Sequence, residues 1–323
     1  MKVYDGIDSF QPPRDGIVLT VGNFDGVHRG HRQLIETARQ RAAELGVPAV
    51  ALTFEPHPRA VLAPHRAPPC LTTLSEKLAL LGSLGLDATV VARSTPALLG
   101  KAAEQFLSEL VASCRPRVIV EGPTFNFGRD RAGSVETLRK WAGQLGFAVI
   151  VIDELYSDEL AARPAISSSA VRRALQEGRV GDANAMLGRP YRISGVVGGG
   201  EQRGTRLGFP TANLAEIPHL LPGAGVYAAV AQLADGALYL AAANIGPQPT
   251  FQQSESRVEA HLLDYSGRLR GQRLGLHMLA RLRGQMRFAG AEQLAAQIRR
   301  DVEQARGLAG ELGRLRAARL PPL

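Results

Sequence analysis

The chain has few of the residues that build disulfide frameworks, zinc sites or stacking surfaces for nucleic acid. It contains two cysteines, Cys70 and Cys114, which stand alone in the sequence without a Cys-x-x-Cys spacing. A disulfide framework and a cysteine-based structural zinc site are therefore excluded. Aromatic residues make up 5% of the chain and do not interleave with a basic run, as a surface for single-stranded nucleic acid would require.

Long apolar segments are also missing. No hydrophobic run approaches the length of a membrane span, and the first residues lack the basic, apolar and small-residue order of a signal peptide. We therefore expect a cytoplasmic protein with no membrane partner. The net charge of +8 comes almost entirely from arginines spread along the chain, and it favours ligands that carry phosphate. A protein that binds RNA through this basic surface remains an alternative.

The first half of the chain alternates apolar strands with amphipathic helices. With 323 residues, 45% of them hydrophobic and 21% charged, the chain is long enough for two globular domains. The alternation predicts a doubly wound parallel sheet whose site lies at the carboxyl ends of the strands. We expect strands at residues 16–21, 49–54, 88–92, 117–121 and 148–152, and helices at 31–45, 75–84, 101–113 and 134–145.

The pattern changes at Gly188-Arg189-Pro190. Helical segments at 168–177 and 181–187 precede this point, and short β-rich pieces separated by glycine and proline follow it, which predicts an antiparallel barrel. The sequence thus predicts a first domain of residues 1–187 and a second domain of residues 188–323. We expect barrel strands at 191–197, 225–233, 237–245, 257–263 and 274–282, a closing helix at 290–306 and a frayed end at 314–323.

The first candidate site is the glycine-rich run of residues 22–31, between the first buried strand and its helix. Gly22 and Gly26 let the backbone bend and let a ligand approach it. The free N–H groups and the positive dipole end of the helix favour an anion. His28 and His31 add donors that can stabilise charge on a phosphoryl group. The run therefore predicts a phosphate-binding site.

The second candidate site lies in the β-rich half. A proline-fixed turn presents Thr211 and Asn213, whose side-chain oxygens suit Mg²⁺ and phosphate. The glycine-rich segment 198–204 resembles a phosphate-cradling loop, although it lacks the lysine of a Walker loop. Glu259 belongs to a run that alternates in strand fashion. It is either part of an exposed polar strand face or a general base in the barrel mouth that acts on a hydroxyl nucleophile.

These residues carry two resemblances. The run His28-Arg29-Gly30-His31 resembles the His-x-Gly-His signature of the nucleotidyltransferase superfamily, whose members attack the α-phosphate of ATP. Over nearly the whole chain, the motifs resemble in order those of the bacterial bifunctional riboflavin kinase/FMN adenylyltransferases, also called FAD synthetases. They are GNFDGVHRGH (22–31), FEPHP (54–58), GPTFNFGRDR (122–131), ISSSAVR (166–172), LGRPY (187–191), LGFPTANL (207–214), GVYAA (225–229), NIGPQPTF (244–251) and VEAHLLD (258–264).

The resemblance implies both a fold and two activities. The N-terminal domain would be a Rossmann-like nucleotidyltransferase that adenylylates FMN, and the C-terminal domain a six-stranded riboflavin kinase barrel with a terminal helix. ATP would be the co-substrate of both reactions and Mg²⁺ the cofactor, with riboflavin and FMN as substrates and FMN and FAD as products. We expect no nucleic-acid partner, and either a monomer or a weak oligomer.

For the adenylyltransferase, the resemblance also implies roles for single residues. ATP would be held by Gly22, Asn23, Phe24, His28, Gly30 and His31, and its β- and γ-phosphates by Ser167, Ser168 and Arg172. His28, His31 and Arg172 would be catalytic. The flavin would be bound by Phe54, Pro56, His57, Pro58, Phe125, Asn126 and Phe127. Two residues depart from the family pattern: Ser169 replaces a threonine, and Thr124 replaces an aspartate near the expected flavin site.

For the kinase, the resemblance assigns ATP and Mg²⁺ binding to Gly208, Pro210, Thr211 and Asn213, with Thr211 and Asn213 as the metal ligands. Glu259 would be the catalytic base that activates the riboflavin 5′-hydroxyl. This half departs from the family at Gly284-Gln285, where acidic residues are usual, and at Gly198, where a histidine is often found. Besides the RNA-binding protein, two alternatives remain: a different His-x-Gly-His adenylyltransferase, acting on a pantetheine or nicotinate nucleotide, and a chain whose kinase half has decayed.

Overall fold

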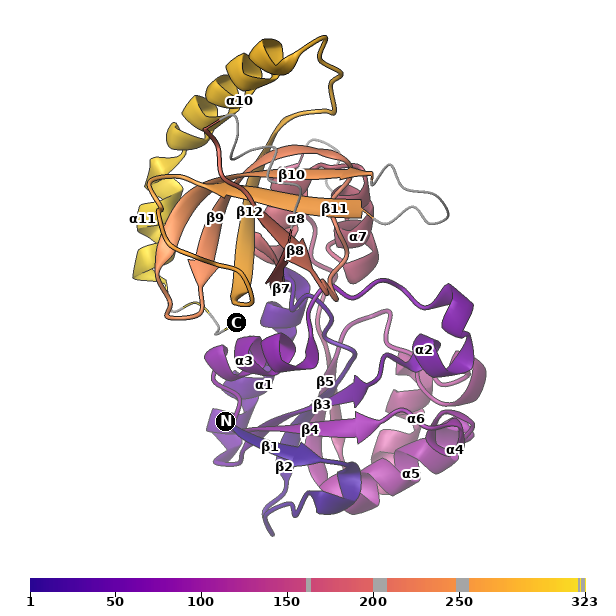
Figure 1. Ribbon diagram of the computed structural model, residues 1–323. Coiled ribbons are helices and arrows are strands. Elements are labelled where there is room, and N and C mark those ends of the chain that lie inside the picture. Colours follow the sequence, from indigo (N-terminus) through magenta and orange to yellow (C-terminus); the bar gives the residue numbers. More distant parts are fainter. Residues whose placement is uncertain (161–163, 200–207, 248–255, 319, 321–322) are drawn as a thin grey trace. The chain divides into compact units, whose positions relative to one another are not determined.

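The computed structural model describes residues 1–160, 164–199, 208–247, 256–318, 320 and 323. The chain divides into two compact units, Met1–Tyr156 and Ser157–Leu323 (Figure 1). Most of the glycine-rich segment 198–204 and the last residues of the NIGPQPTF motif, 248–251, lie outside the described residues.

The first unit is built on a parallel sheet of six strands in the order β1-β4-β3-β2-β5-β6. Its central strand β2 is buried at every residue, because helices cover both faces of the sheet. The predicted doubly wound sheet is confirmed, and β1, which the sequence did not predict, is added at the edge beside β4. The strands are β1 (Lys2–Asp5), β2 (Ile17–Val21), β3 (Ala49–Glu55), β4 (Ala88–Arg93), β5 (Pro116–Glu121) and β6 (Ala148–Val151).

The helices of this unit lie on the two faces of the sheet. Because side chains alternate along a strand, α1 and α3 pack on the face that carries Val18 and Val120, and α5 and α6 on the face that carries Leu19 and Ile119. The helices are α1 (Arg29–Leu45), α2 (Pro58–Leu62), α3 (Leu74–Ser83), α4 (Pro96–Leu99), α5 (Ala103–Cys114) and α6 (Val135–Leu145), with 3-10 turns at Ile7–Ser9, Pro64–Arg66 and Arg129–Arg131.

The strand order reverses between β2 and β5. From β2 the chain moves outward through β3 to β4, and then crosses to β5 and β6 on the other side of β2. Doubly wound sheets bind ligands outside the carboxyl ends of their strands at such a switch point. Residues 22–28 begin there, directly after β2.

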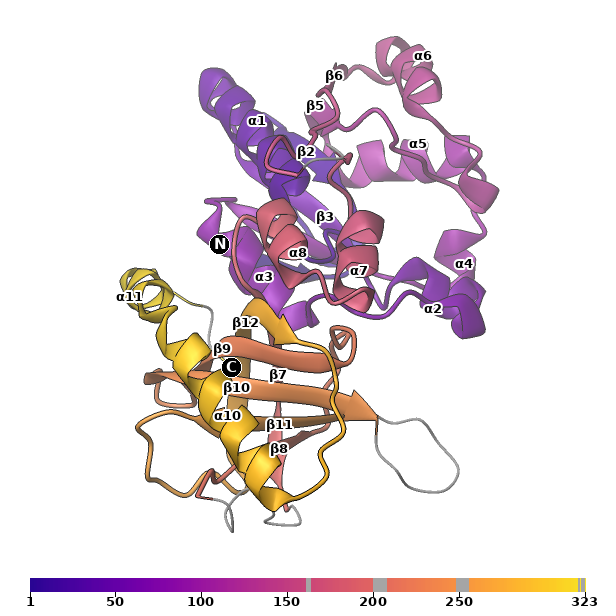
Figure 2. The same cartoon turned by 90° about the horizontal axis from the view of Figure 1, so that it is seen from above.

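The second unit contains a closed barrel of six antiparallel strands in the order β10-β11-β8-β7-β12-β9 (Figure 2). The six-stranded barrel expected from the resemblance is therefore confirmed. One of its strands, β8, falls on the Ala-Asn-Leu-Ala segment, which the sequence did not predict as a strand. The strands are β7 (Tyr191–Gly198), β8 (Ala212–Ala215), β9 (Gly225–Leu233), β10 (Leu238–Pro247), β11 (Ser256–Leu262) and β12 (Arg273–Arg283).

In the described part of the chain, four helices accompany the barrel: α7 (Ser168–Gln176), α8 (Val180–Leu187), α10 (Ala291–Arg306) and α11 (Ala309–Ala317). Asn184 fastens α8 to two strands, since its Nδ2 donates to the Met278 carbonyl at 2.8 Å and its Oδ1 accepts from the Tyr191 N–H at 2.7 Å. On the outer face, α10 and α11 cover β9 and β10 (Figure 2), and Leu240 packs with Val302 there.

Some boundaries differ from the expected ones. The end of the chain from residue 314 was expected to be frayed, but α11 extends to Ala317 and buries Leu315 in the cluster beneath the helices. Helix α1 starts at Arg29 rather than at residue 31, because the His28 side chain caps it. Helices α7 and α8 fall in the compact unit of the barrel, and the predicted division after residue 187 stays a prediction.

None of the helices in the described part of the chain combines the length and the apolar character that a membrane crossing needs.

Candidate active sites

The turn of residues 22–28 has a tightly defined backbone. Phe24 and Val27 adopt φ angles of 47° and 39°, in the left-handed region that side chains rarely adopt. Both side chains are almost completely buried, with 0% and 1% of their surface exposed. Packing of these two side chains therefore offsets the backbone strain and fixes the shape of the turn.

A buried carboxylate holds the middle of the turn. Asp25 accepts hydrogen bonds from the N–H groups of Leu71 and Thr72 at 3.0–3.2 Å and from the Thr72 hydroxyl at 3.1 Å. The N–H of Gly26 donates to the same hydroxyl at 3.1 Å. Asp25 therefore ties the turn to the loop before α3, a role that the sequence motif did not reveal.

The two histidines meet at the start of α1. His28 is the N-cap residue, and its Nδ1 accepts the His31 N–H at 3.3 Å. The two imidazole rings stack with centroids 3.6 Å apart, and the edge of Phe24 packs on His31 at 5.2 Å. The predicted pair is thus brought together at the positive end of a helix of 17 residues, which is where an anion is favoured.

Three further residues were expected to hold phosphates of ATP. Ser167 caps α7, because its hydroxyl accepts the Ala170 N–H at 3.2 Å. Ser168 and Arg172 lie in the first turns of the same helix and are half-buried. All three belong to the second compact unit, and their role at the ATP site stays a prediction.

The predicted aromatic flavin residues lie near the end of β3 and in the loop after β5. Phe54 and Phe125 are partly buried, and both pack against the apolar cluster that contains Leu19 and Ile119. Phe127 is 6% exposed, and its ring stacks on Phe125 at 5.4 Å, so core packing already accounts for it. The amide of Asn126 donates to the Thr124 carbonyl at 2.6 Å, which shapes the loop after β5.

The FEPHP segment turns directly into helix α2. Its Glu55–Pro56 peptide bond is cis, and Pro58 occupies the first helical position. His57 caps the helix through Nδ1, which accepts the Arg59 N–H at 3.1 Å. His57 and Pro58 therefore have a structural role at the start of α2. Flavin binding by these residues stays a prediction.

In the barrel, three polar residues stand side by side on adjacent strands. Asn213 of β8 lies opposite Glu259 of β11, which in turn lies opposite Asn244 of β10. Directly opposed residues share a sheet face. Their strand neighbours Val258 and Ile245 are at most 1% exposed and face the barrel interior. The polar row is therefore on the outer face, which agrees with the first of the two alternatives for Glu259, a polar strand face. A role of Glu259 as a base stays a prediction.

The surroundings of Glu259 are polar and half-buried. The Arg257 guanidinium lies on the same face of β11, with Nε 3.4 Å from Glu259 Oε1. His261, the next residue on this face, donates from Nδ1 to the Pro210 carbonyl at 2.8 Å and contacts the Phe209 ring edge-on. These contacts hold the segment that precedes β8, which carries Gly208 with a φ of 83° and Thr211, close to the row.

Asn213 was expected to bind Mg²⁺. Its Oδ1 is buried and has no hydrogen-bond partner within the described part of the chain. The same described residues contain no cluster of three or more His, Cys, Asp or Glu side chains that could hold a metal ion. Amide, hydroxyl and carbonyl oxygens with water suit Mg²⁺, so the residues present fit that ion.

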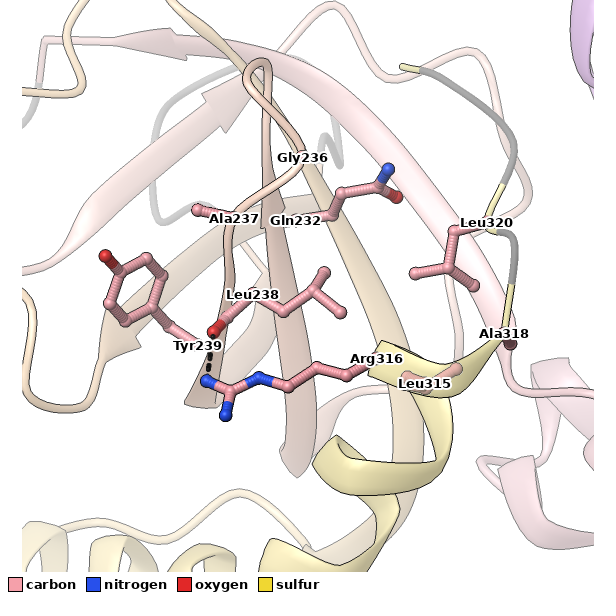
Figure 3. Close-up of a pocket in the computed structure, with 9 residues that line it drawn as sticks. All are labelled: Gln232, Gly236, Ala237, Leu238, Tyr239, Leu315, Arg316, Ala318 and Leu320. Carbon is pink, nitrogen blue, oxygen red and sulfur yellow. Dashed lines mark hydrogen bonds between the residues drawn. The ribbon is translucent and has the colours of Figure 1, made fainter.

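A separate cavity of about 440 Å³ lies at the β9–β10 hairpin, beside the end of α11 (Figure 3). Arg316 reaches across it and donates to the Leu238 carbonyl at 3.3 Å. Leu238 and Asn244 are six residues apart on β10, which corresponds to about 20 Å. The cavity contains none of the predicted site residues. Its lining residues are Gln232, Gly236, Ala237, Leu238, Tyr239, Leu315, Arg316, Ala318 and Leu320.

Two family profiles match successive parts of the chain. A profile of the FAD synthetase family matches residues 11–170, and a profile of the riboflavin kinase family matches residues 187–309. The bifunctional riboflavin kinase/FMN adenylyltransferase of Escherichia coli (strain K12) is 37% identical over 96% of this chain and 98% of its own length. The chain belongs to the bifunctional riboflavin kinase/FMN adenylyltransferase family.

A second relative supports the assignment to this family, and a solved structure is similar in fold. The riboflavin kinase/FMN adenylyltransferase of Pseudomonas fluorescens is 36% identical over 96% of this chain and 98% of its own length. A crystal structure described as a macrolide-efflux protein from Streptococcus pneumoniae has a TM-score of 0.84 at 26% identity, covering 95% of this chain and 99% of that one. Because the family match continues through the barrel, a shorter adenylyltransferase without a kinase domain is excluded.

Proposed function

We propose that the chain makes FAD from riboflavin in two steps, each on its own domain. The barrel phosphorylates riboflavin with ATP to give FMN and ADP, and the N-terminal domain transfers AMP from ATP to FMN to give FAD and diphosphate. The observation that carries this proposal is that each half holds its own constellation: the capped histidine pair at the start of α1, and the Asn213–Glu259 pair on the barrel.

In adenylyl transfer, the turn binds and orients ATP. Gly22, Asn23, Phe24 and Gly30 offer backbone close to the nucleotide, and His28 and His31 stabilise the charge that develops on the α-phosphoryl group. A phosphate oxygen of FMN attacks the α-phosphorus in line, and diphosphate leaves, so no covalent intermediate with the protein is needed.

The remaining predicted residues complete this first site. Ser167, Ser168 and Arg172 hold the β- and γ-phosphates, which become the leaving diphosphate. The flavin lies against Phe54 and Phe125, with Asn126, Phe127 and the segment Pro56-His57-Pro58 around it. Thr124 leaves this site without the carboxylate that is usual there, so we expect altered flavin affinity rather than loss of binding.

In the kinase reaction, Glu259 takes the proton of the riboflavin 5′-hydroxyl. The oxygen then attacks the γ-phosphorus of ATP, and ADP leaves. Arg257, with Nε 3.4 Å from Oε1, orients the Glu259 side chain. Gly208 and Pro210 shape the segment that receives the ATP phosphates.

Thr211 and Asn213 would hold Mg²⁺ through their side-chain oxygens. Bound there, the ion would neutralise charge on the phosphates of ATP. The support for this assignment is the buried Asn213 Oδ1, which has no hydrogen-bond partner within the described residues. A cytoplasmic location, where ATP is abundant, belongs to the proposal, as does a monomer or weak oligomer without a nucleic-acid or membrane partner.

The test is incubation of the purified chain with riboflavin, ATP and Mg²⁺, followed by chromatographic separation of the flavins. We expect FMN to appear first and FAD after it, and no product when Mg²⁺ is replaced by a chelator. FMN without FAD would refute the first site, FAD only from added FMN would indicate a decayed kinase, and neither product would refute the proposal. A shift of random RNA that ATP does not compete away would support the RNA-binding alternative.

A further inference from the structure

The segment Val21–Asn23 connects the central strand to the turn at the ATP site. It is held on one side by a buried carboxyl group from β5 and on the other by a buried ammonium group from α3. Glu121 is 2% exposed and Lys77 is 5% exposed. Ionisable side chains are rarely buried to this extent without a specific partner.

Glu121 occupies the switch point of the sheet. The β2–β5 ladder pairs Leu19 with Ile119. Two residues further along, the N–H of Val21 donates to Glu121 Oε1 at 2.6 Å, so a side chain takes the place that a strand carbonyl would have. The carboxyl group therefore lies between the carboxyl ends of β2 and β5, at the floor of the crevice where such sheets bind nucleotides.

Lys77 holds the other end of the segment. Its Nζ donates to the Asn23 carbonyl at 3.3 Å and to the Phe54 carbonyl at 3.3 Å. The Thr53 hydroxyl also donates to the Asn23 carbonyl, at 3.2 Å. The peptide group between Asn23 and Phe24 is thus fixed directly before the residue whose φ angle is left-handed. Lys77 is therefore placed to hold the chain where it bends into the turn.

We propose that Glu121 and Lys77 are positioning residues for adenylyl transfer. Together they fix the backbone where the turn begins, so that the N–H groups of the turn and both histidines can contact the phosphates of ATP. The inference rests on the proposed function of this turn as the ATP site. Both residues act through the backbone, Glu121 through Val21 and Lys77 through Asn23.

The carboxyl group of Glu121 does not need a charge for this role. Burial raises its pKa well above the ordinary range, although the N–H groups of Val21 and Gly122 oppose the shift. A neutral carboxyl still offers a carbonyl oxygen to the Val21 N–H, and it adds no negative charge beneath a polyphosphate. Glutamine should therefore replace Glu121, whereas leucine should not.

Four variants of the full-length chain test the inference: E121L, E121Q, K77M and I119V. Ile119 is a matched control, because it is buried on the same face of β5, two residues before Glu121. For each variant, kcat and KM for ATP are measured for FAD formation from FMN, together with riboflavin phosphorylation in the same preparation. Hydrogen exchange of the peptide that spans residues 20–28 reports the order of the turn.

We expect E121L and K77M to lower kcat/KM for ATP in FAD formation by on the order of 10²-fold, the cost of a misplaced binding group. The loss should appear in KM as well as in kcat, and exchange in the turn should be faster. E121Q and I119V should behave like the parental chain. Kinase activity should stay unchanged in all four variants, which shows that the second unit is intact. Parental hydrogen exchange in the first unit outside residues 20–28 shows that the first unit is folded.

Parental FAD formation in both E121L and K77M would overturn the inference and leave the proposed function standing. If E121Q lowered kcat/KM for ATP as much as E121L, the role assigned to the neutral carboxyl group would be overturned. A parental chain that makes no FAD would refute the proposed function instead. Hydrogen exchange would then still decide whether Glu121 and Lys77 order the turn, since unchanged exchange in E121L and K77M would overturn that role as well.

Discussion

The side-chain amide of Gln285 donates to Oδ1 of Asn244 at 2.9 Å. The same amide donates to the Ile245 carbonyl at 2.8 Å. Asn244 lies directly opposite Glu259 in the β10–β11 pair, so Gln285 orients a residue beside the proposed base. Gln285 is also one of the two positions where the resemblance led us to expect acidic residues.

An acidic residue at position 285 is therefore expected to impair this kinase. In Q285E the side chain can no longer donate to Asn244 or Ile245, and it adds a negative charge near Glu259. Two lost hydrogen bonds of about 1 kcal/mol each correspond to a decrease in kcat/KM for riboflavin of roughly tenfold or more. Steady-state kinetics of riboflavin phosphorylation measure this decrease. FAD synthesis from FMN is the control and should be unaffected. Unchanged or faster phosphorylation would show that the amide contacts are dispensable.

Substitution of His28 should stop the second reaction alone. The H28A change removes the cap of α1, the ring stacked on His31 and one donor to the α-phosphoryl group. We expect FAD formation to fall by on the order of 10²–10³, as for the loss of one donor to a transition-state oxyanion. FMN should still accumulate from riboflavin. FAD formation at the parental rate would contradict the assignment of the ATP site.

Fragments of the chain test where the kinase domain begins. The sequence predicts a boundary after residue 187, whereas α8 buries Met186 and Leu187 in the compact unit of the barrel, and Asn184 bonds to β7 and β12. We expect a fragment of residues 157–323 to unfold at a higher temperature than a fragment of residues 188–323, because the shorter one exposes the surface that α8 covers. Circular dichroism measures both. Equal melting temperatures would favour the boundary after residue 187.

Periodicity predicted the regular elements, because strand and helix patterns are local properties of the sequence. It missed β1 and β8, which have four residues each and form only because a neighbouring strand pairs with them. It also missed helix α11. Burial of Leu315 beneath the barrel helices orders that segment, and no local signal reports such a contact.

The motif of residues 22–31 located the histidine pair correctly, since a strand, a glycine turn and a helix start are all visible in the sequence. The groups that hold this turn come from distant segments. Thr72 lies before α3, Lys77 lies on α3, and Glu121 ends β5. Of these residues, only Glu121 stands out in the sequence, because it is a charged residue at the end of an apolar strand. The others depend on tertiary contacts that no spacing rule contains.

The direction in which Glu259 points could not be deduced either. Alternation shows which residues share a face of a strand. It does not show which of the two faces points into the closed barrel. The structure decides this through Val258 and Ala260, which are completely buried on the opposite face.

We propose that one chain carries two separable flavin reactions, and the variant E259Q tests this most directly. Glutamine keeps the size of the side chain but cannot accept the proton, so riboflavin phosphorylation should fall by roughly 10²–10⁴. Separation of the flavins after incubation with ATP and Mg²⁺ should show unconverted riboflavin, whereas FMN supplied to the same preparation should become FAD at the parental rate. Riboflavin phosphorylation at the parental rate, or loss of both reactions together, would contradict this account.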